Sequence, residues 1–294
     1  MCACGRAETF SLAIGSNYLL DSEQQWRIKA GCDVARVIAI ADQKGGVGKT
    51  TTAINLSAAL AIAQKETLVV DCDPQANATG GLGFPKDPAR RSIYNCLLQK
   101  LPLESIMLKC QLEHLFLIPS DKNLVGATVE IIDLPEREQV LRRKLEPLRE
   151  RFEFILLDCP PALDLLAINA LVAADSVLVP IQCEYFALEG VSELLDTLMR
   201  IRRAQKLTLA VEGILLTMFD ERTNLSRQVR DDLKDFFGSQ VFSTFIPRNV
   251  RLAEAPSHGQ PVLTYDPRSS GAESYRQLAE EVIAHAEKGV GARA

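Results

Sequence analysis

The stretch that most constrains how this 294-residue chain can fold is ADQKGGVGKTT, residues 41–51. The apolar run ARVIAIA precedes it, and TTAINLSAALAIAQ, in which apolar residues recur at helical spacing, follows it. Gly45, Gly46 and Gly48 allow several backbone N–H groups to point at one polyphosphate, and the helix that follows adds its positive N-terminal end. A strand, a glycine-rich loop and a helix in this order predict the phosphate-binding loop of an α/β protein.

The lysines and threonines of the loop supply the remaining contacts that a nucleoside triphosphate needs. We expect Lys49 to reach the β- and γ-phosphates and the Thr50 hydroxyl to ligate Mg²⁺. Where the general pattern G-x-x-x-x-G-K-[ST] begins with glycine, this chain has Gln43, and Lys44 adds a second lysine. The predicted nucleotide contacts of the loop are Lys44, Gly45, Gly46, Val47, Gly48, Lys49, Thr50 and Thr51.

Two other segments place carboxylates at the ends of apolar runs. In VVDCDP, Asp71 and Asp73 stand two residues apart, so in an extended chain they share a face and can approach the same Mg²⁺ and water. In FILLDCPP, Asp158 follows four apolar residues, which is typical of the carboxylate that acts on the magnesium ion of a nucleoside triphosphatase through water. Neither signal is specific alone, but together with the glycine loop they indicate a site of nucleotide hydrolysis.

Apolar runs alternate with helical segments along the rest of the chain. TLVVD, HLFLIPS, FEFILLDCP, DSVLVPI and EGILLTMF are each typical of a buried strand. This alternation predicts an α/β fold: one doubly wound, mostly parallel sheet flanked by helices, with ligands bound beyond the C-terminal ends of the strands. The expected helices between the strands cover 135–152, 162–173, 188–205, 226–237 and 272–286.

The organised part of the chain is expected to begin at residue 34. Residues 1–33 show no strong periodicity, so we predict either a disordered N-terminal extension or a natural start at Val34. Residues 34–288 are predicted to form one P-loop ATPase domain, followed by a flexible tail at 289–294. The hydrophobic content of 47% and charged content of 24% are those of an ordinary globular protein.

Composition also bears on the cellular setting. The net charge of −5 gives no global sign of nucleic-acid binding, although a local basic patch can bind phosphates on an acidic protein. No run approaches the ~18–20 apolar residues of a membrane span, and FSLAIGSNYLL lacks the basic flank of a signal peptide. None of the eight cysteines has C-x-x-C spacing, which predicts buried, reduced thiols and a cytoplasmic location.

Six segments in the same order resemble the ParA (Soj) family of chromosome- and plasmid-partitioning ATPases, whose phosphate loop is of the deviant Walker A type. The similarity covers about 34–286. It implies ATP and Mg²⁺ as cofactors, a homodimer with ATP sandwiched between its subunits, and sequence-independent DNA binding on the nucleoid. It further implies a ParB-like centromere-binding partner that stimulates hydrolysis. The segments are KGGVGKTT, DCDPQANAT, LLDCPPALDLLAINAL, PIQCEYFALEG, LTMFDERTNLSRQV and IPRNVRLAEAPSHGQPVLTYDPRSSGAESY.

The resemblance assigns catalytic roles to Lys44, Lys49 and Asp73. Lys44 matches the family's signature lysine, which crosses the dimer interface to the phosphates bound by the other subunit. Two triphosphates that face each other would repel, and a long cation from each subunit offsets that repulsion. Asp73 matches the residue that orients or activates the attacking water, and Asp71 is interpreted as a structural partner or an outer-shell partner of the ion.

Further positions follow from the same resemblance. Pro247 and Asn249 match the loop that holds the adenine, and Met218 and Asp220 lie where relatives pack the base and its edge. Glu184 is a candidate to face the partner subunit, against the simpler interpretation of a solvated glutamate. For His258, a role in shaping its loop is favoured over catalysis.

Two arginines, Arg222 and Arg251, match positions that carry DNA-contacting arginines in relatives. Such contacts to phosphates add salt-dependent affinity without base specificity. The charged segment REQVLRRKLEPLRER is interpreted instead as the polar face of an amphipathic helix. A basic strip that could extend the DNA surface consists of Arg200, Arg202, Arg203 and Lys206.

Three other protein classes share this type of loop. A membrane-associated, MinD-like ATPase needs an amphipathic C-terminal helix, yet the final segment AEEVIAHAEKGVGARA offers few large apolar residues, chiefly Val282 and Ile283. An iron–sulfur carrier of the nitrogenase-reductase type has a cysteine where this chain has Pro161. A purely structural nucleotide-binding protein would not need Asp73. One departure from the family pattern is Asp42, where an amide is common, because it puts a negative charge beside the phosphates.

Overall fold

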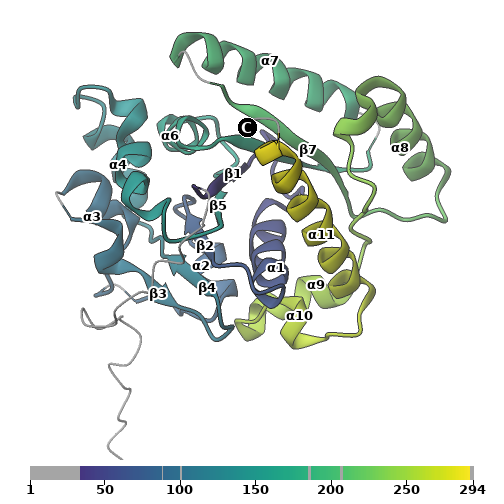
Figure 1. Cartoon of the computed structure of the whole chain (residues 1–294), viewed down its shortest axis with the longest axis horizontal. Helices are drawn as coiled ribbons and strands as arrows, with labels where there is room; N and C mark the ends of the chain where they lie inside the picture. The colour runs from purple at the N-terminus through teal and green to yellow at the C-terminus, as the bar shows by residue number, and fades with distance from the viewer. Residues whose placement is uncertain (1–33, 88, 100, 185–186, 206–207, 292–294) are drawn as a thin grey trace, which may run out of the picture.

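One seven-stranded sheet runs through the molecule, with helices on both of its faces (Figure 1). The computed structural model describes residues 34–291 apart from 88, 100, 185–186 and 206–207. The strands lie in the order β3-β4-β2-β5-β1-β6-β7, and all neighbours pair in parallel except β3 with β4. The predicted doubly wound, mostly parallel sheet is confirmed. The strands are β1 Arg36–Ile40, β2 Thr67–Asp71, β3 Leu108–Lys109, β4 Leu115–Ile118, β5 Phe154–Asp158, β6 Ser176–Gln182 and β7 Ala210–Thr217.

The helices follow the strands along the chain, as expected for a doubly wound fold. The extension predicted for residues 1–33 lies outside the described residues, and so do the last three residues of the chain. The α-helices are α1 Lys49–Ile62, α2 Asn77–Gly81, α3 Ile93–Leu98, α4 Leu124–Glu130, α5 Val140–Leu145, α6 Leu165–Ala173, α7 Ala187–Gln205, α8 Asn224–Phe237, α9 Val250–Glu254, α10 Val262–Tyr265 and α11 Ser270–Gly291.

The central strands are mostly apolar, with polar residues only at their ends, because both of their faces are covered. Every residue of β2 and β5 is buried. In β1, Val37 and Ala39 join the core beneath α3 to α8, whereas Ile38 and Ile40 join the core beneath α1 and α11. Side chains alternate between the two faces of a strand, so each apolar run supplies both layers. This explains why the strands are recognisable as continuous apolar runs.

Parallel register brings the motif-bearing strand ends to one edge of the sheet. β1 lies between β5 and β6, and its last residue, Ile40, is opposite both Asp158 and Leu178. β2 lies on the other side of β5, with Asp71 opposite Asp158. The glycine loop and the two strand-ending aspartates therefore meet at the C-terminal edge, where ligands of such folds bind.

The single helix expected at 135–152 is wrong in its continuity. The segment consists of a 3₁₀ turn at Arg137–Gln139, the short helix α5, and a second 3₁₀ turn at Glu146–Leu148. Pro147 lies within the second turn and cannot donate a backbone hydrogen bond, which ends the α-helical pattern. The amphipathic character is nevertheless present, because the main apolar residues of the segment are buried while charged ones such as Arg142 and Arg143 are exposed. The buried residues are Val140, Leu141, Leu145 and Leu148.

The described cysteines are buried, free thiols, in agreement with the prediction, while Cys2, Cys4 and Cys32 lie outside the described residues. Burial raises the pKa of the Cys110 thiol to about 12, which keeps it protonated at neutral pH. Within the described part of the chain, no helix has the combination of length and apolar character that a membrane span requires.

Candidate active site

The glycine loop joins β1 to α1 in a conformation that opens its backbone to a ligand. Gly46 and Gly48 have φ angles of 78° and 93°, in the left-handed region that favours glycine. A Cβ at Gly45 or Gly46 would meet no atom within 4 Å, so the surface of the loop is open there. α1 begins at Lys49 directly after the loop, and the helix N-terminus thus adds its unpaired N–H groups to the loop.

Lys49 spans this loop. Its Nζ donates a hydrogen bond of 2.7 Å to the carbonyl oxygen of Lys44, and only 7% of the residue is exposed. Burial lowers the pKa of the Lys49 ammonium, while the charges of Asp42 and Asp158 act in the opposite direction. The ammonium is therefore held over the loop, in reach of an anion bound by the backbone.

Asp158 is a fully buried carboxylate, and the Thr50 hydroxyl and the Lys49 ammonium are its favourable neighbours. It is 0% exposed, and neither of its oxygens accepts a hydrogen bond from the described residues. Burial and the neighbouring charge of Asp71 raise its pKa well above the usual range, against the influence of the nearby Thr50 hydroxyl. An isolated buried carboxylate is costly unless a cation or a hydrogen bond compensates it. Asp158 thus fits the water-mediated magnesium contact that the sequence predicts for it.

The described residues would not enclose a metal ion by themselves. No group of three or more His, Cys, Asp or Glu side chains in the described part of the chain is arranged as a metal site. Mg²⁺ retains several waters and binds through few protein ligands plus substrate phosphates. Thr50 and Asp158 beside an open phosphate loop match that mode of binding.

Asp71 organises the turn that follows β2. Its Oδ2 accepts hydrogen bonds from the backbone N–H of Thr79 at 2.8 Å and from the Thr79 hydroxyl at 2.7 Å. Its Oδ1 accepts the backbone N–H of Asp73 at 3.2 Å. Burial raises the pKa of Asp71 to about 6, although these hydrogen bonds lower it. Its contacts are those of the structural partner that the sequence suggests.

Asp73 is held at the same edge by two loops. Its Oδ1 accepts the backbone N–H of Gln75 at 2.9 Å, and its carbonyl oxygen accepts the Ser120 hydroxyl at 2.8 Å. Ser120 follows β4, and its backbone N–H donates to the Thr79 hydroxyl at 3.0 Å. Asp73 is 8% exposed, so its carboxylate is positioned by the protein rather than by solvent.

Lys44 points away from its own loop. Its Nζ forms an ion pair with Glu184, which follows β6, and 52% of the lysine side chain remains exposed. The backbone N–H of Lys44 donates to Asp42 Oδ1 at 3.2 Å, and burial raises the pKa of Asp42. Asp42 therefore supports the loop backbone at the position where the sequence led us to expect an amide.

Two loops predicted to hold the base lie side by side. The backbone N–H of Phe219 donates to the carbonyl of Ile246 at 3.0 Å, and that of Arg248 donates to the carbonyl of Phe219 at 3.2 Å. Met218 has a φ of 50°, which is rare for such a residue, and Pro247 pairs with Phe219 in a parallel bridge. Met218 and Pro247 are thus brought together, as a shared base-binding loop pair requires.

Comparison with known proteins places these features in a family. A family model described as an AAA domain matches residues 35–211. The chain is 49% identical over 252 residues to the sporulation initiation inhibitor protein Soj of Bacillus subtilis. The aligned region covers 86% of this chain and 100% of that protein. It is also 49% identical over 250 residues to the chromosome partitioning protein ParA of Myxococcus xanthus, covering 85% and 88%. The chain belongs to the ParA/Soj family.

A solved structure supports the fold of this ParA/Soj member. The cobyrinic acid a,c-diamide synthase of Mycobacterium smegmatis, solved with a bound ATP analog and magnesium, superposes with a TM-score of 0.76 at 34% identity. The match covers 87% of this chain and 97% of that one.

The two arginines matched to ParA/Soj DNA contacts lie outside the phosphate loop and are both engaged in ion pairs. Arg222, whose side chain is 89% exposed, pairs with Asp220 at 2.8 Å. Arg251, 51% exposed, pairs with Glu254 at 2.8 Å and with Asp266 at 3.2 Å. Of the basic strip, Arg200, Arg202 and Arg203 lie on α7, and Lys206 falls outside the described residues.

Asn249 and His258 serve the local structure around Arg251. Asn249 accepts the backbone N–H of Arg251 at 2.8 Å and so caps α9, while its amide donates to the Ser270 hydroxyl at 2.8 Å. The His258 ring stacks on Tyr265 with centroids 4.8 Å apart, which fits the loop-shaping role expected of it.

The sequence missed three hydroxyl residues that shape the site: Thr79, Ser120 and Thr217. Thr217, the last residue of β7, donates to the carbonyl of Val47 at 2.8 Å and anchors the phosphate loop from the far side. The position of Thr217 at the end of a predicted strand could have indicated that it lies at the ligand-binding edge of the sheet. Thr79 and Ser120 are connected to Asp71 and Asp73 only through the folded loops.

A close contact of two glycines joins the loop after α2 to the loop after α9. Gly83 and Gly259 have φ angles of 93° and 64°. A Cβ at Gly259 would lie 2.8 Å from the Gly83 Cα, and one at Gly83 would lie 3.0 Å from the Gly259 oxygen. Side chains are excluded at both positions by space as well as by backbone conformation.

Proposed function

We propose that this ParA/Soj member is an ATP-dependent partitioning switch that hydrolyses ATP to ADP and phosphate with Mg²⁺. The observation that carries the proposal is Asp158, whose two buried and unpartnered oxygens lie at the sheet edge next to the phosphate loop. A metal cation bound beside such a buried carboxylate would add to the charge that Lys49 already supplies. The Myxococcus xanthus relative at 49% identity is named a chromosome partitioning protein, and the M. smegmatis structure was solved with an ATP analog and magnesium.

In the proposed reaction each residue acts on the triphosphate from a fixed position. The loop backbone and Lys49 bind the β- and γ-phosphates, and Lys49 exchanges its contact with the Lys44 carbonyl for a phosphate oxygen. Thr50, and Asp158 through water, would hold Mg²⁺, which would supply positive charge beside the phosphate oxygens. Asp73 orients the attacking water and accepts its proton.

Lys44 is proposed to act on the other subunit of an ATP-dependent homodimer. Its ammonium pairs with Glu184, and half of its side chain is exposed. An exposed ion pair is weak, so a γ-phosphate presented by a second subunit can replace Glu184 as the partner. The dimer would then sandwich two ATP molecules between facing phosphate loops.

The ATP dimer is proposed to bind DNA without sequence preference through Arg222 and Arg251. Guanidinium groups bind phosphates in bidentate fashion, and two subunits present twice the number of such contacts. We further propose that a ParB-like centromere-binding protein stimulates hydrolysis and releases the dimer from the nucleoid in the cytoplasm. Hydrolysis would remove the γ-phosphate that stabilises the closed state.

A membrane-associated, MinD-like role is disfavoured by the packing of α11. Leu278 and Val282 are fully buried in the core that α11 shares with α1, and Ile283 packs against the same core. The apolar side of this helix is therefore already used within the fold, so it is not free to enter a lipid interface.

The test of the proposed function is retention of non-specific duplex DNA with ATP and with ADP. We expect wild-type protein to retain DNA with ATP only, Lys44→Ala to lose retention, and Arg251→Ala to retain DNA more weakly. Lys44→Ala should still bind ATP as a monomer, whereas Arg251→Ala should still dimerise. Equal retention in both nucleotides would defeat the switch.

A matched control is Arg143→Ala. Arg143 lies on α5, is 50% exposed and pairs with Glu136, so it resembles Arg251 in exposure and pairing. It should retain DNA as the wild-type protein does. Loss of retention in this variant as well would assign DNA binding to general positive charge instead of to the predicted surface.

A further inference from the structure

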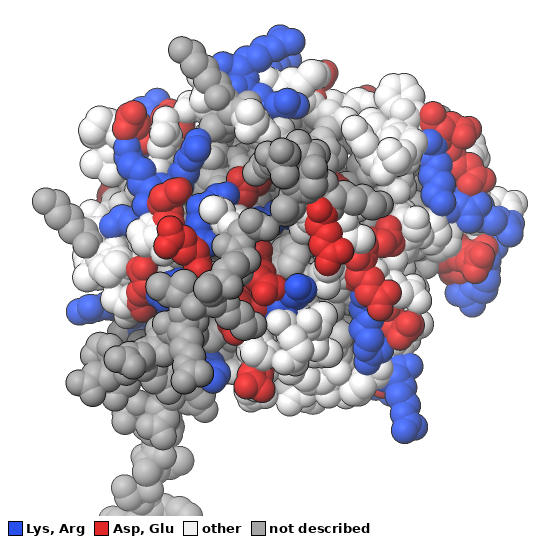
Figure 2. Space-filling view, in the orientation of Figure 1, with Lys and Arg blue, Asp and Glu red and all other residues white. Residues whose placement is uncertain are grey.

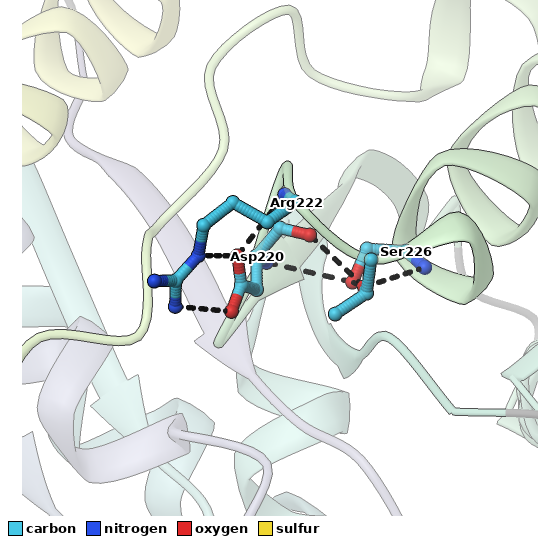
Figure 3. Close-up of polar contacts among 4 residues, drawn as sticks. Asp220, Arg222 and Ser226 are labelled. Carbon is cyan, nitrogen blue, oxygen red and sulfur yellow. Dashed lines mark hydrogen bonds and ion pairs between the residues drawn. The ribbon is translucent and has the colours of Figure 1, made fainter.

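The guanidinium of Arg222 is closed on one carboxylate. Its Nε donates to Asp220 Oδ1 at 2.9 Å and its Nη2 donates to Oδ2 at 2.8 Å, while the Arg222 backbone N–H also donates to Oδ1, at 3.1 Å (Figure 3). These hydrogen bonds hold the pKa of Asp220 at about 2. The pair is therefore charged on both sides at every physiological pH.

The two members of the pair differ in how firmly they are held. The Asp220 side chain is 25% exposed, whereas that of Arg222 is 89% exposed. The backbone of Asp220 is fixed to the start of α8, because its carbonyl accepts the Thr223 hydroxyl at 3.0 Å and its N–H donates to the Ser226 hydroxyl at 3.4 Å (Figure 3). Thr223 also caps α8 through the Ser226 N–H. Asp220 is thus a fixed acceptor, and Arg222 is the mobile partner that can leave.

Carboxylates neutralise both of the predicted DNA-contacting arginines. Arg251 has the same kind of arrangement, with Glu254 at 2.8 Å and Asp266 at 3.2 Å. On the face shown in Figure 2, blue basic side chains are interleaved with red acidic ones and do not form a single basic field. A DNA phosphate that takes the Nε–Nη2 edge of Arg222 must therefore displace Asp220, and at either arginine it meets a guanidinium whose charge a carboxylate already offsets.

We propose that Asp220 is a gate on Arg222 that restrains DNA binding by the single subunit. The inference rests on the proposed DNA-binding function and adds its regulation. An exposed ion pair is weak, so one phosphate gains little by exchanging with Asp220. When several phosphates bind the arginines of two subunits at once, their combined binding free energy exceeds the cost of displacing the carboxylates, because contacts on one rigid dimer reinforce each other. The gate makes DNA retention depend on the dimer.

The experiment is a double-mutant cycle of Asp220→Asn and Arg222→Ala, read as the dissociation constant for a non-specific duplex. Each protein is measured with saturating ADP and with a slowly hydrolysed ATP analogue, at several salt concentrations. Asp220→Asn should tighten DNA binding about three- to fivefold per subunit. It should also steepen the plot of log K against log salt by about one phosphate contact per subunit.

Arg222 must be present for this gain. The double variant should bind DNA as weakly as Arg222→Ala alone. If Asp220→Asn tightens binding equally in the Arg222→Ala background, the carboxylate acts through general charge or through the bound base, and the gate is refuted.

The other outcomes separate the gate from the proposed function. If Arg222→Ala weakens DNA binding but Asp220→Asn does not strengthen it, the DNA surface stands and the gate falls. If Arg222→Ala binds DNA as the wild type does, Arg222 does not contact DNA. Both the gate and the proposed DNA contact of Arg222 are then refuted.

Asp235→Asn is the control for charge. Asp235 is exposed near the far end of α8, about 16 Å along the helix from its start at 1.5 Å per residue. That distance exceeds the Debye length of about 10 Å at 0.1 M salt. The DNA affinity of Asp235→Asn should stay within about twofold of that of the wild type. A gain in affinity equal to that of Asp220→Asn would overturn the proposal.

Discussion

At the nucleotide edge of the sheet, Asp158 is fully buried and has no hydrogen-bond partner among the described residues. At the rim of the molecule, Arg222 is 89% exposed and is nevertheless held by a bidentate ion pair with Asp220. The usual expectation is the reverse, since buried charges are generally paired and exposed ones solvated. At the nucleotide edge, the buried charge of Asp158 is unfavourable until a ligand compensates it. At the surface, the charge of Arg222 would be stable in water, yet Asp220 pairs with it until a ligand competes.

Asp73→Ala gives the largest effect that this comparison predicts. We expect stimulated ATP hydrolysis to fall by about 10²–10⁴, the usual contribution of a positioned acid–base group, because the attacking water loses its acceptor. Steady-state phosphate release measures this. ATP affinity should remain within about threefold of the wild type, since Asp73 is not assigned to the phosphates. Retention of a tenth or more of the activity would remove Asp73 from the chemistry.

Asp158→Asn tests directly whether the buried charge is kept for a ligand. We expect the nucleotide-free protein to become more stable by about 1–3 kcal/mol, because an unpaired buried carboxylate is replaced by a neutral amide. The gain in ATP affinity from Mg²⁺ should fall by about 10–100-fold. Chemical denaturation and nucleotide titrations with and without Mg²⁺ report the two effects. If nucleotide-free Asp158→Asn were less stable than the wild type, the buried charge of Asp158 would not be one that is kept for a ligand.

Asp71 gives the nucleotide edge a dependence on pH. Its pKa is about 6 in the folded protein, above the ordinary aspartate value of 3.8, so between these values the folded state holds a proton that the unfolded state has released. The free energy of unfolding contributed by Asp71 therefore falls as pH rises from about 4 to 6. Relative to Asp71→Asn, the wild type should lose about 2 kcal/mol between pH 4.5 and 6.5. A difference that is independent of pH would contradict the expectation.

Arg251→Ala sharpens the comparison from the rim. DNA affinity should fall about three- to tenfold at low salt, and the salt dependence should decrease by about one phosphate contact per subunit. The free energy of unfolding should change by less than about 0.5 kcal/mol, because exposed ion pairs contribute little. Denaturation curves beside DNA titrations test both. A loss of stability as large as the loss of binding would make Arg251 a structural residue.

The strands were predictable because burial on both faces leaves mainly apolar residues in them, with polar residues at their ends. β5, for example, is FILLD, and all of its residues are buried. The glycine loop was equally clear, because phosphate binding demands glycines at φ angles above zero, as at Gly46 and Gly48. β3 was missed since it has only two residues, Leu108–Lys109. The break at Pro147 was missed because the apolar spacing continues through it.

The site was less predictable where it depends on contacts across the fold. Asp71 and Asp158 were identified from their places at strand ends, but their direct pairing in register needed the order of the strands. The ion pairs of Lys44 with Glu184 and of Arg222 with Asp220 arise from local side-chain geometry that spacing alone does not determine. Thr79 and Ser120 reach the carboxylates through loops with no periodic signal.

The contact of Gly83 with Gly259 has a consequence for mutation in this protein. α2 follows the turn that holds Asp73, and Gly259 closes the 3₁₀ turn Ala255–His258 directly after α9. Addition of one methyl group to either glycine would push these two segments apart. The absence of side chains at Gly83 and Gly259 therefore sets how closely the segment that follows Asp73 can approach the segment that follows α9, the helix that carries Arg251.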